Sequence, residues 1–505
     1  MRPGLNSRRG WLVLPVTAMV LAASAGCESN TDEGVLADAP ASSAETASTP
    51  SSATVISSTN TVAPDESVAV ADSRCVAPSG GAQQEIAVWY AIGNDSEKKL
   101  IELTDRFNEL ATGVTVRLEK SGNYSETLRA LGEAAPDDRP DALLTDVKGL
   151  RDIFDSGFVV TPNDCAAAGA SSMDDLLPVV ASSYSINGVL QAFPYNVSIP
   201  VLMFDASLLR AAGLDPDEPP RTLEELSSTA QQIVESGVAP HGFVAWDGYG
   251  PWFVTQYNSR RGQLSGIPDN GREGEPVAKV DFASPEVVKS FDWLRTEVET
   301  GRALWIGGNP SGTDDLLRLV DRADGAAMTI TTSGAIGDIA RLLGSGALDD
   351  PATGLPPELG VGPMPGPGSG ALVGGGAFVL LDSGDAGRVG AASSFVSWLS
   401  DAPQHAEFAG YTGFSPIRSA ELDQPTLRAA WEETPQLRVA FDELVDLSGD
   451  VVRSGPAWGA GFDIDRLLYE TLTAVIENGD TLVRLQDATA QANSLLGVYN
   501  AGIGG

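Results

Sequence analysis

From residue 85 onward, apolar residues alternate between short continuous runs and a helical spacing of three and four. Residues 85–92 have the composition of a buried strand, and a helix capped by Asp95 or Ser96 is predicted to follow. The buried face of this helix is formed by Leu100, Leu103, Phe107 and Leu110. The folded part therefore begins with a strand and an amphipathic helix.

The same alternation continues to Asp146. Residues 114–118 alternate as a strand, residues 124–134 are predicted to be helical, and residues 142–145 form a further strand that ends at Asp146. This β-α-β-α-β order predicts an α/β fold, with helices on both faces of a mainly parallel sheet. Ligands of such folds bind outside the carboxyl ends of the strands, where Asp146 would lie.

A second series starts with a strand at residues 200–204 and a helix at 206–212. Two later helices have clear starts, because Thr222 and Glu225 form a capping box and Ser284 precedes Pro285. Further strands are predicted at 325–331 and 372–381, the glycine-rich residues 360–376 are predicted to form a connector, and the chain beyond is mostly helical.

The N-terminal segment is predicted to be a signal peptide spanning residues 1–26, with a basic head and an apolar run. Ser24-Ala25-Gly26-Cys27 resembles a lipobox, which predicts lipidation of Cys27, and the alternative is a secreted protein with an ordinary cysteine. Ser7 to Leu12 resembles a twin-arginine motif, so either export route is open. Residues 27–82 would then be the lipidated cysteine and a disordered linker of serine, threonine, alanine and proline.

The charge and the motifs of the chain exclude several kinds of partner and site. The formal net charge of −36 repels nucleic-acid phosphates, so nucleic acid is not expected as a partner. The chain has two histidines without metal-ligand spacing, no G-x-S-x-G elbow and no Walker loop, so no metal, cofactor or catalytic residue is predicted. With Cys27 assigned to lipid, Cys75 and Cys165 remain as a disulfide or as two free thiols.

Several short motifs occur in the order found in a known family. They include Trp89-Tyr90, Gly122-Asn123-Tyr124, Phe193-Pro194-Tyr195-Asn196, Ala211-Ala212-Gly213-Leu214-Asp215, Ala327-Met328-Thr329, Gly374-Gly375-Gly376-Ala377 and Thr412-Gly413-Phe414-Ser415-Pro416-Ile417. From residue 85 to its end, the chain resembles the family 1 extracellular solute-binding proteins, and within them the glycerol-3-phosphate-binding type.

The resemblance implies a two-lobed periplasmic-binding-protein fold with three hinge crossings. About 430 residues follow the linker, more than one core usually organises, which also favours two lobes. We expect one lobe to comprise residues 83–198 and 330–372, and the other 199–329 and 373–505. The crossings are expected at 200–204, 325–331 and 372–381, so that the lobes close on a ligand held between them.

The ligand contacts that the resemblance implies fall on Tyr124, Asp146, Ser198, Trp252, Ser333, Gly375 and Phe414. Trp89 and Trp458 are also expected to contact ligand, and Tyr195, Trp246 and Tyr249 are further aromatic candidates near the matched motifs. Each aromatic residue could instead be ordinary core packing, Asp146 could be a helix N-cap, and Gly375 could be needed only for backbone shape.

One departure from the family pattern concerns the ligand. The glycerol-3-phosphate-binding type has a late arginine that meets the phosphate, and Trp458 stands at that place, which removes a bidentate partner for phosphate. Arg260 or Arg453 could substitute, but neither is in register, and Phe414 replaces a tyrosine. A neutral carbohydrate or polyol is therefore favoured, or a glycerophosphodiester whose choline is held by aromatic rings.

These features predict the solute-binding subunit of an ABC importer, exported and lipid-anchored at the outer face of the cell membrane, which delivers its solute to membrane permease subunits and is not an enzyme. Two alternatives remain at this point. One is a secreted glycoside-active lipoprotein, which would need a suitably spaced carboxylate pair. The other is a sensor with the same fold that presents its ligand to a receptor.

Overall fold

A computed structural model describes residues 74–78, 83–110, 112–259, 268–309, 312–321, 323–345, 356–366, 372–445 and 454–503. The predicted signal peptide, the lipidation site Cys27 and nearly all of the predicted linker lie outside these residues, as do Arg260 and Arg453. No helix in the described ranges is long and apolar enough to cross a membrane.

The first lobe is built on a mixed sheet in the order β2-β1-β3-β13-β4, with β7 also paired to β13. Its strands are β1 (Gln84–Tyr90), β2 (Val114–Lys120), β3 (Ala142–Asp146), β4 (Val159–Val160), β7 (Phe193–Ser198) and β13 (Gly374–Leu381). Its helices are α1 (Asn94–Glu109), α2 (Tyr124–Glu133), α3 (Leu150–Asp155), α4 (Pro178–Ser183), α11 (Ala386–Ser400) and α12 (Ala402–Thr412). A small hairpin, β5 (Ser185–Ile186) with β6 (Val189–Leu190), precedes β7.

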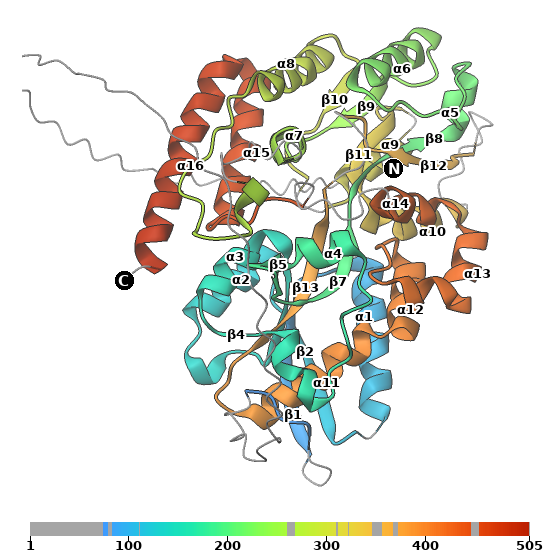
Figure 1. Ribbon diagram of the computed structural model, residues 1–505. Helices are drawn as coiled ribbons and strands as arrows, with labels where there is room; N and C mark the ends of the chain where they lie inside the picture. The colour runs from blue at the N-terminus through green and yellow to red at the C-terminus, as the bar shows by residue number, and fades with distance from the viewer. Residues whose placement is uncertain are drawn as a thin grey trace, which may run out of the picture. The chain divides into compact units, whose positions relative to one another are not determined.

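The second lobe is built on a sheet in the order β10-β9-β11-β8-β12. Its strands are β8 (Pro200–Asp205), β9 (His241–Ala245), β10 (Ala303–Trp305), β11 (Ala326–Thr332) and β12 (Leu359–Pro363). Its helices are α5 (Ala206–Ala211), α6 (Leu223–Ser236), α7 (Tyr249–Ser259), α8 (Pro285–Glu299), α9 (Asp314–Val320), α15 (Gly461–Asn478) and α16 (Thr481–Ile503). Helices α15 and α16 lie side by side next to α8 (Figure 1).

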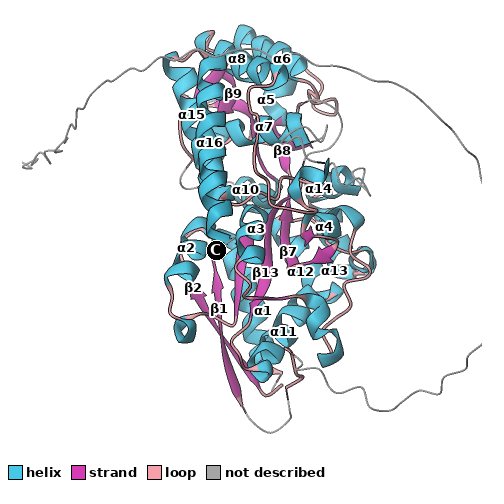
Figure 2. Ribbon diagram, turned by 60° about the vertical axis from the view of Figure 1, so that its left-hand side comes forward, coloured by secondary structure: helices cyan, strands magenta, loops and turns pink. Residues whose placement is uncertain are grey.

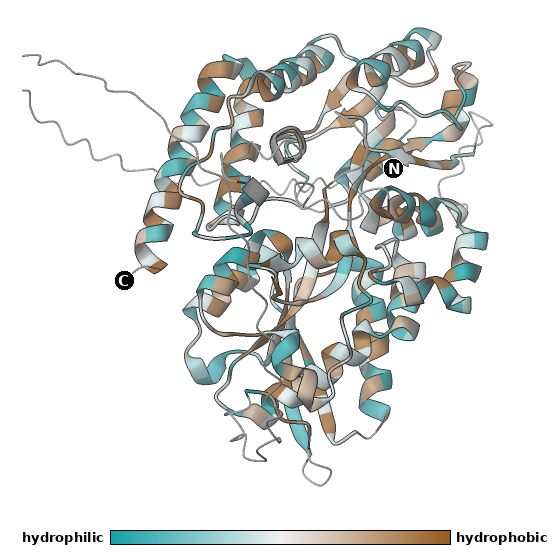
Figure 3. Ribbon diagram, viewed as in Figure 1, coloured by the Kyte–Doolittle hydropathy of each residue, from teal (hydrophilic) through white to brown (hydrophobic). Residues whose placement is uncertain are grey.

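Helices flank both sheets, as the alternating pattern predicts (Figure 2). Both sheets are mixed rather than mainly parallel, because the strands at the crossings run against their neighbours. Strand β13 is antiparallel to β3, and β8 is antiparallel to both β11 and β12. Many strand residues are apolar, as the brown colour of the ribbon in Figure 3 shows, and their side chains belong to buried clusters.

Sheet membership differs from the expectation at two strands. Strand β12 pairs with β8 in the second sheet, whereas residues 330–372 were expected in the first lobe. Strand β13 pairs with β3 in the first sheet, and α11 packs on it, whereas residues 373–505 were expected in the second lobe. Both strands are apolar or glycine-rich, so their sequences do not indicate which sheet they join. Residues 360–363 and 374–376, which were expected in a connector, therefore belong to strands.

The chain passes from the first sheet to the second between β7 and β8, at Ile199. It returns between β12 and β13, and it passes to the second lobe again between α12 and α15. The expected crossing at residues 325–331 is wrong, because β11 lies inside the second sheet between β9 and β8. Helices α10 (Ile336–Gly344), α13 (Pro425–Glu433) and α14 (Gln436–Val445) lie along the crossings, where an apolar cluster contains residues of both sheets.

Helix starts were predicted with mixed success. The capping box of Thr222 and Glu225 and the Ser284 cap are present as predicted. The predicted cap of α1 is wrong, because the helix begins at Asn94, with Gly93 at the cap position. Asp95 lies inside the helix, where its carboxylate pairs with Lys98 and Arg341.

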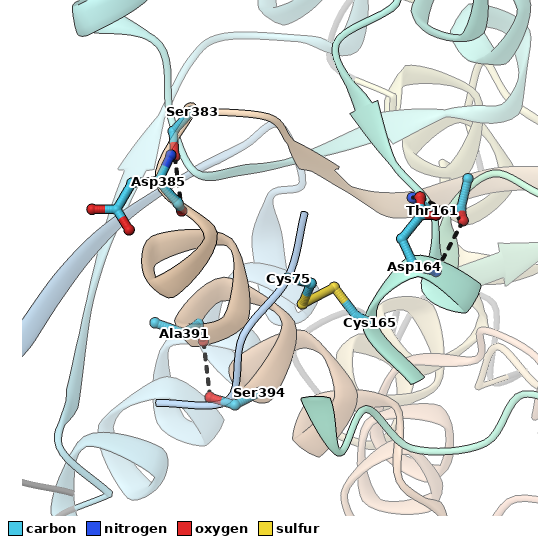
Figure 4. Close-up of a disulfide and its surroundings, with 8 residues drawn as sticks. All are labelled: Cys75, Thr161, Asp164, Cys165, Ser383, Asp385, Ala391 and Ser394. Atoms are coloured by element: carbon cyan, nitrogen blue, oxygen red, sulfur yellow. Dashed lines mark hydrogen bonds between the residues drawn. A yellow bond between two sulfur atoms is a disulfide. The ribbon is translucent and has the colours of Figure 1, made fainter. Parts of the chain in front are cut away.

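The disulfide predicted between Cys75 and Cys165 is present, with the two Cα atoms 5.1 Å apart (Figure 4). It fixes residues 74–78 against the first lobe. The Val76 amide donates to the Ala386 carbonyl at the start of α11, and a Cβ at Gly390 would lie 1.7 Å from the Val76 oxygen. Only glycine therefore allows this segment to approach α11 so closely.

Candidate functional site

A pocket of about 220 Å³ lies between the two lobes, beside the crossings. The first lobe and the crossings beside it contribute Asp146, Val147, Lys148, Ser198, Ile199, Leu372, Val373, Gly374 and Gly375, and strands β8 and β11 of the second sheet contribute Pro200 and Thr332. The second lobe and its connecting segment contribute Trp246, Gly248, Pro251, Trp252, Thr255, Gly455, Pro456, Trp458, Asp465 and Tyr469. Because both lobes line it, hinge closure would change its contacts with a ligand.

The first-lobe wall is formed where β3 ends. The Asp146 carboxylate accepts a hydrogen bond of 2.9 Å from the Lys148 amide, so it caps the short 3-10 helix η2 (Val147–Gly149). Burial raises the pKa of Asp146, against the opposing effect of Lys148. Asp146 is therefore an N-cap that also lines the pocket, and its contact with ligand stays a prediction.

An ion pair joins the two lobes across this wall. The Lys148 ammonium lies 2.6 Å from the carboxylate of Asp465, which α15 contributes from the second lobe. Burial alone would lower the pKa of Lys148, but Asp465, Tyr469 and Asp146 raise it well above its ordinary value. Lys148 is therefore cationic across the physiological pH range.

Indole rings form the second-lobe wall. The rings of Trp246 and Trp252 meet edge to face, with centroids 5.2 Å apart and planes at 81°. Behind them Tyr249 is fully buried, and its hydroxyl donates to the Val244 carbonyl and accepts from the Ile330 amide. Tyr249 supports this wall from the core, and Trp246 and Trp252 face the pocket.

Two further residues complete the lining near the crossings. Gly375 has φ of +84°, and a Cβ there would lie 2.0 Å from the Asn196 carbonyl oxygen, so the backbone shape requires glycine. Trp458 is 2% exposed, and its ring meets Phe282 edge to face at 6.0 Å. Its indole reaches the pocket from the segment that precedes α15.

Five of the nine residues expected to contact ligand line this pocket: Asp146, Ser198, Trp252, Gly375 and Trp458. Their role in binding stays a prediction. The other four, Tyr124, Ser333, Phe414 and Trp89, do not line it.

The four residues outside the lining have other contacts. The Tyr124 hydroxyl accepts a 2.7 Å hydrogen bond from the side-chain amide of Asn196, and the Trp89 indole donates to the Glu119 carboxylate at 2.9 Å. Phe414 stacks on Phe408, with centroids 5.7 Å apart and planes at 8°.

Ser333 belongs to the hinge. It is fully buried, its hydroxyl accepts from the Ile199 amide at 3.2 Å, and its own amide donates to the Ile199 carbonyl at 2.9 Å. These bonds tie the end of β11 to the residue at which the chain crosses between the lobes. The other aromatic candidate of the first lobe, Tyr195, is fully buried in the core.

Sequence reasoning missed Lys148, Asp465 and Tyr469. Lys148 follows the carboxyl end of β3 by two residues, a position at which ligand contacts are expected, so that signal was available. Asp465 and Tyr469 lie in one helix and are separated from Lys148 by more than three hundred positions. Only the folded chain brings them to the first lobe.

No group of three or more residues that could hold a metal ion occurs in the parts of the chain that the structure describes. A larger hollow of about 1010 Å³ lies on the second lobe beside β10, lined by residues that include His241, Trp305 and Arg318. All of its lining residues belong to that lobe, so hinge closure would not enclose it.

Comparisons with known proteins agree with this fold. A family model for bacterial extracellular solute-binding proteins matches residues 102–439. The sn-glycerol-3-phosphate-binding periplasmic protein UgpB of Brucella melitensis is 26% identical over 371 residues, covering 70% of this chain and 79% of that protein. The protein of the same name from Pectobacterium atrosepticum is 24% identical over 441 residues, covering 84% and 94%.

Solved structures show the same two-lobed fold. UgpB from Mycobacterium tuberculosis, in complex with glycerophosphocholine, has a TM-score of 0.63 at 19% identity, covering 83% of this chain and 98% of that one. The GacH receptor of Streptomyces glaucescens, solved unliganded and with acarbose, has a TM-score of 0.65 at 20% identity, covering 83% and 100%. From the family match and the two-lobed fold, the chain belongs to the bacterial extracellular solute-binding proteins, which are not enzymes.

Proposed function

We propose that this protein is the lipid-anchored solute-binding subunit of an ABC importer. It captures a neutral carbohydrate, a polyol or a choline-bearing glycerophosphodiester between its lobes and delivers it to permease subunits in the membrane. The observation that carries this proposal is the pocket between the lobes, where Trp246, Trp252 and Trp458 face carboxylates and backbone groups.

The lining suits a sugar or a polyol. Such molecules have apolar faces, on which indole rings stack, and hydroxyl edges, which need carboxylates, hydroxyls and backbone groups as partners. Trp252 and Trp246 supply the rings, and Asp146, Ser198 and Asp465 supply hydrogen-bonding groups. Comparable ligands are named for two solved structures of this fold, which hold acarbose and glycerophosphocholine.

A choline group is the other chemistry that the pocket favours. Aromatic faces attract a quaternary ammonium, and two nearby carboxylates add to that attraction. Asp146 and Asp465 are both in the lining, beside the indole rings. The diester phosphate of such a ligand carries one negative charge and would lie away from them.

Transport requires an open and a closed arrangement of the two lobes. A solute held by residues of both lobes gains contacts on closure that the open form lacks, so binding shifts the population toward the closed form. The crossing at Ile199 is flanked by the bonds to Ser333, which gives the movement a defined hinge. A permease would then distinguish the loaded form from the empty one by its lobe arrangement.

The anchor would be Cys27, which lies outside the described residues. A lipid on this cysteine would keep the binding lobes near a membrane permease. Cys27→Ser is expected to release the exported protein from the membrane fraction, and a variant that stays in that fraction would refute the anchor.

The test of ligand class is a thermal-shift screen of the full exported chain carrying Cys27→Ser, against sugars, polyols and glycerophosphodiesters. A ligand present at a hundred times its Kd stabilises the folded state by about 2.7 kcal/mol, which raises Tm measurably. The proposal predicts a hit in one of these three classes. Shifts confined to amino acids, peptides or metal ions would overturn it.

Delivery to a permease needs a separate experiment. Deleting the gene is expected to abolish uptake of the radiolabelled hit by whole cells, and the Cys27→Ser variant should restore less uptake than the unmodified gene. Unchanged uptake in the deletion strain would favour the sensor role instead.

A further inference from the structure

The ion pair across the pocket determines which charge a ligand meets. The charged side chains in the described lining are Asp146, Lys148 and Asp465, so Lys148 is the only cation among them. Its ammonium lies 2.6 Å from the Asp465 carboxylate. The described lining thus contains two carboxyl groups and one ammonium.

The position of Asp465 is fixed by close contact between the lobes. At the start of α15, a Cβ at Gly461 would lie 2.2 Å from the Lys148 carbonyl oxygen, so the helix touches the first-lobe backbone. The Asp152 carboxylate of α3 accepts a 3.0 Å hydrogen bond from the Ala460 amide. These contacts hold the first turns of α15 against η2, with Asp465 facing Lys148.

The two partners are unequally accessible. The Asp465 side chain is 7% exposed and that of Lys148 is 38% exposed, so a ligand can approach the lysine more easily than the aspartate. A phosphate monoester that approached Lys148 would compete with a carboxylate already in contact with it. It would also be repelled by Asp146 and Asp465 in a partly desolvated pocket, where charges interact more strongly than in water.

We propose that Asp465 is a specificity-determining residue: by holding Lys148 in an ion pair between the lobes, it withholds that cation from the ligand and selects neutral solutes over phosphate monoesters. This inference rests on the proposed function, because it assigns the charge preference of the same pocket. The choice of ligand would then depend on Asp465, a residue of α15 in the described lining.

The test uses two proteins that both carry Cys27→Ser, one with Asp465→Asn and one without it. Isothermal titration calorimetry measures the affinity of each for sn-glycerol-3-phosphate and for inorganic phosphate. Removing the carboxylate frees Lys148 for a charge-assisted hydrogen bond, so affinity for both probes should rise by roughly tenfold or more. Lys148→Gln combined with Asp465→Asn should abolish that gain, because no cation then remains in the described lining.

The matched control is Asp463→Asn. It removes the same charge from the same helix two residues away, but Asp463 is 55% exposed and pairs with Arg466 on the surface. Its affinity for phosphate should stay that of the unmodified chain. An equal gain in this control would show that overall charge, and not the ion pair, excludes phosphate, which overturns the proposal.

The remaining outcomes are also decisive. Tight binding of sn-glycerol-3-phosphate by the unmodified chain, or no gain in a folded Asp465→Asn variant, would refute the role of Asp465. Melting curves of each variant without ligand show whether it is folded, and Asp465→Ser serves if Asp465→Asn is not. A failed screen for neutral solutes would refute the proposed function, whereas the change in phosphate affinity is measured independently of that screen.

Discussion

Asp152 makes the contact between the lobes dependent on pH. It lies in α3, and its carboxylate accepts a hydrogen bond of 3.0 Å from the Ala460 amide at the start of α15. Burial raises the pKa of Asp152 to about 6, despite the opposing hydrogen bonds from the backbone of Ala460 and Gly461. An aspartate in the unfolded chain has an ordinary pKa near 3.9.

The direction in which stability changes with pH follows from the proton that Asp152 binds in the folded state. Because the folded state holds a proton that the unfolded state has lost, the stability from this group is full below about pH 4 and disappears as pH rises through 6. A shift of about two pKa units corresponds to about 3 kcal/mol, so ionised Asp152 costs up to that amount at pH 7.5.

Asp152→Asn keeps the acceptor for the Ala460 amide and removes the charge. The variant should therefore be more stable than the parent chain by up to about 3 kcal/mol at pH 7.5, and by about half as much at pH 5. Urea unfolding of both proteins at the two pH values measures this difference. Asp338, whose pKa burial also raises to about 6, titrates in both proteins and cancels.

Asp152→Ala is the matched control, because it removes the charge and the acceptor together. It should be less stable than Asp152→Asn by about 1 kcal/mol at both pH values, the ordinary contribution of one hydrogen bond. If the free energies of unfolding of the parent and of Asp152→Asn differ by the same amount at pH 5 and at pH 7.5, the reasoning is refuted. It is also refuted if Asp152→Asn is less stable than the parent at pH 7.5.

Three further changes test the crossings and the disulfide. Gly375→Ala should lower stability by at least about 1 kcal/mol and lower Tm, because φ is +84° and a Cβ would lie 2.0 Å from a backbone oxygen of β7; an unchanged Tm would contradict this. Ser333→Ala removes the acceptor of the Ile199 amide and should lower the free energy of unfolding by about 1 kcal/mol, which urea titration measures. Reducing the disulfide between Cys75 and Cys165, which are 90 positions apart, should lower stability by up to about 4 kcal/mol, and equal Tm values with and without reductant would be evidence against this.

Much of the local structure could be predicted from the sequence. Strand β1, predicted at residues 85–92 and observed at Gln84–Tyr90, and the buried helix positions Leu100 and Phe107 follow from hydrophobic spacing, and the capping box at Thr222 is local by nature. Leu110, predicted on the same buried face, follows the end of the helix and is 55% exposed. The start of α1 could not be predicted in this way, because Asp95 forms ion pairs with Lys98 and Arg341 instead of capping the helix.

Sheet membership was harder to predict, because it depends on contacts between distant segments. Strands β12 and β13 are separated by a short segment yet join different sheets. Gly360 and Gly362 allow this for β12, since a Cβ at either residue would meet Phe204 or Pro219 of the second lobe. Glycines are common in connectors as well, so their presence alone favoured the wrong interpretation.

Some residues of the candidate site could also be predicted from the sequence, and others could not. Asp146 was predicted from its place at the end of a strand, and Trp252 and Gly375 from the family pattern, and all three line the pocket. Ser333 and Phe414 carry the same family signal, but the Ser333 hydroxyl accepts from the Ile199 amide at the crossing and Phe414 stacks on Phe408 of the first lobe. Asp465 carried no signal, because its effect depends on Lys148 in the other lobe.

Calorimetry with the hit from the screen tests whether the pocket between the lobes binds the solute. The unmodified chain should bind one molecule, and Trp252→Ala should weaken binding by roughly tenfold or more, because a stacking face is lost. Trp305→Ala, which alters the larger hollow beside β10, should bind as tightly as the unmodified chain. Full affinity in Trp252→Ala together with lost affinity in Trp305→Ala would show that the solute binds in the hollow beside β10 and not between the lobes.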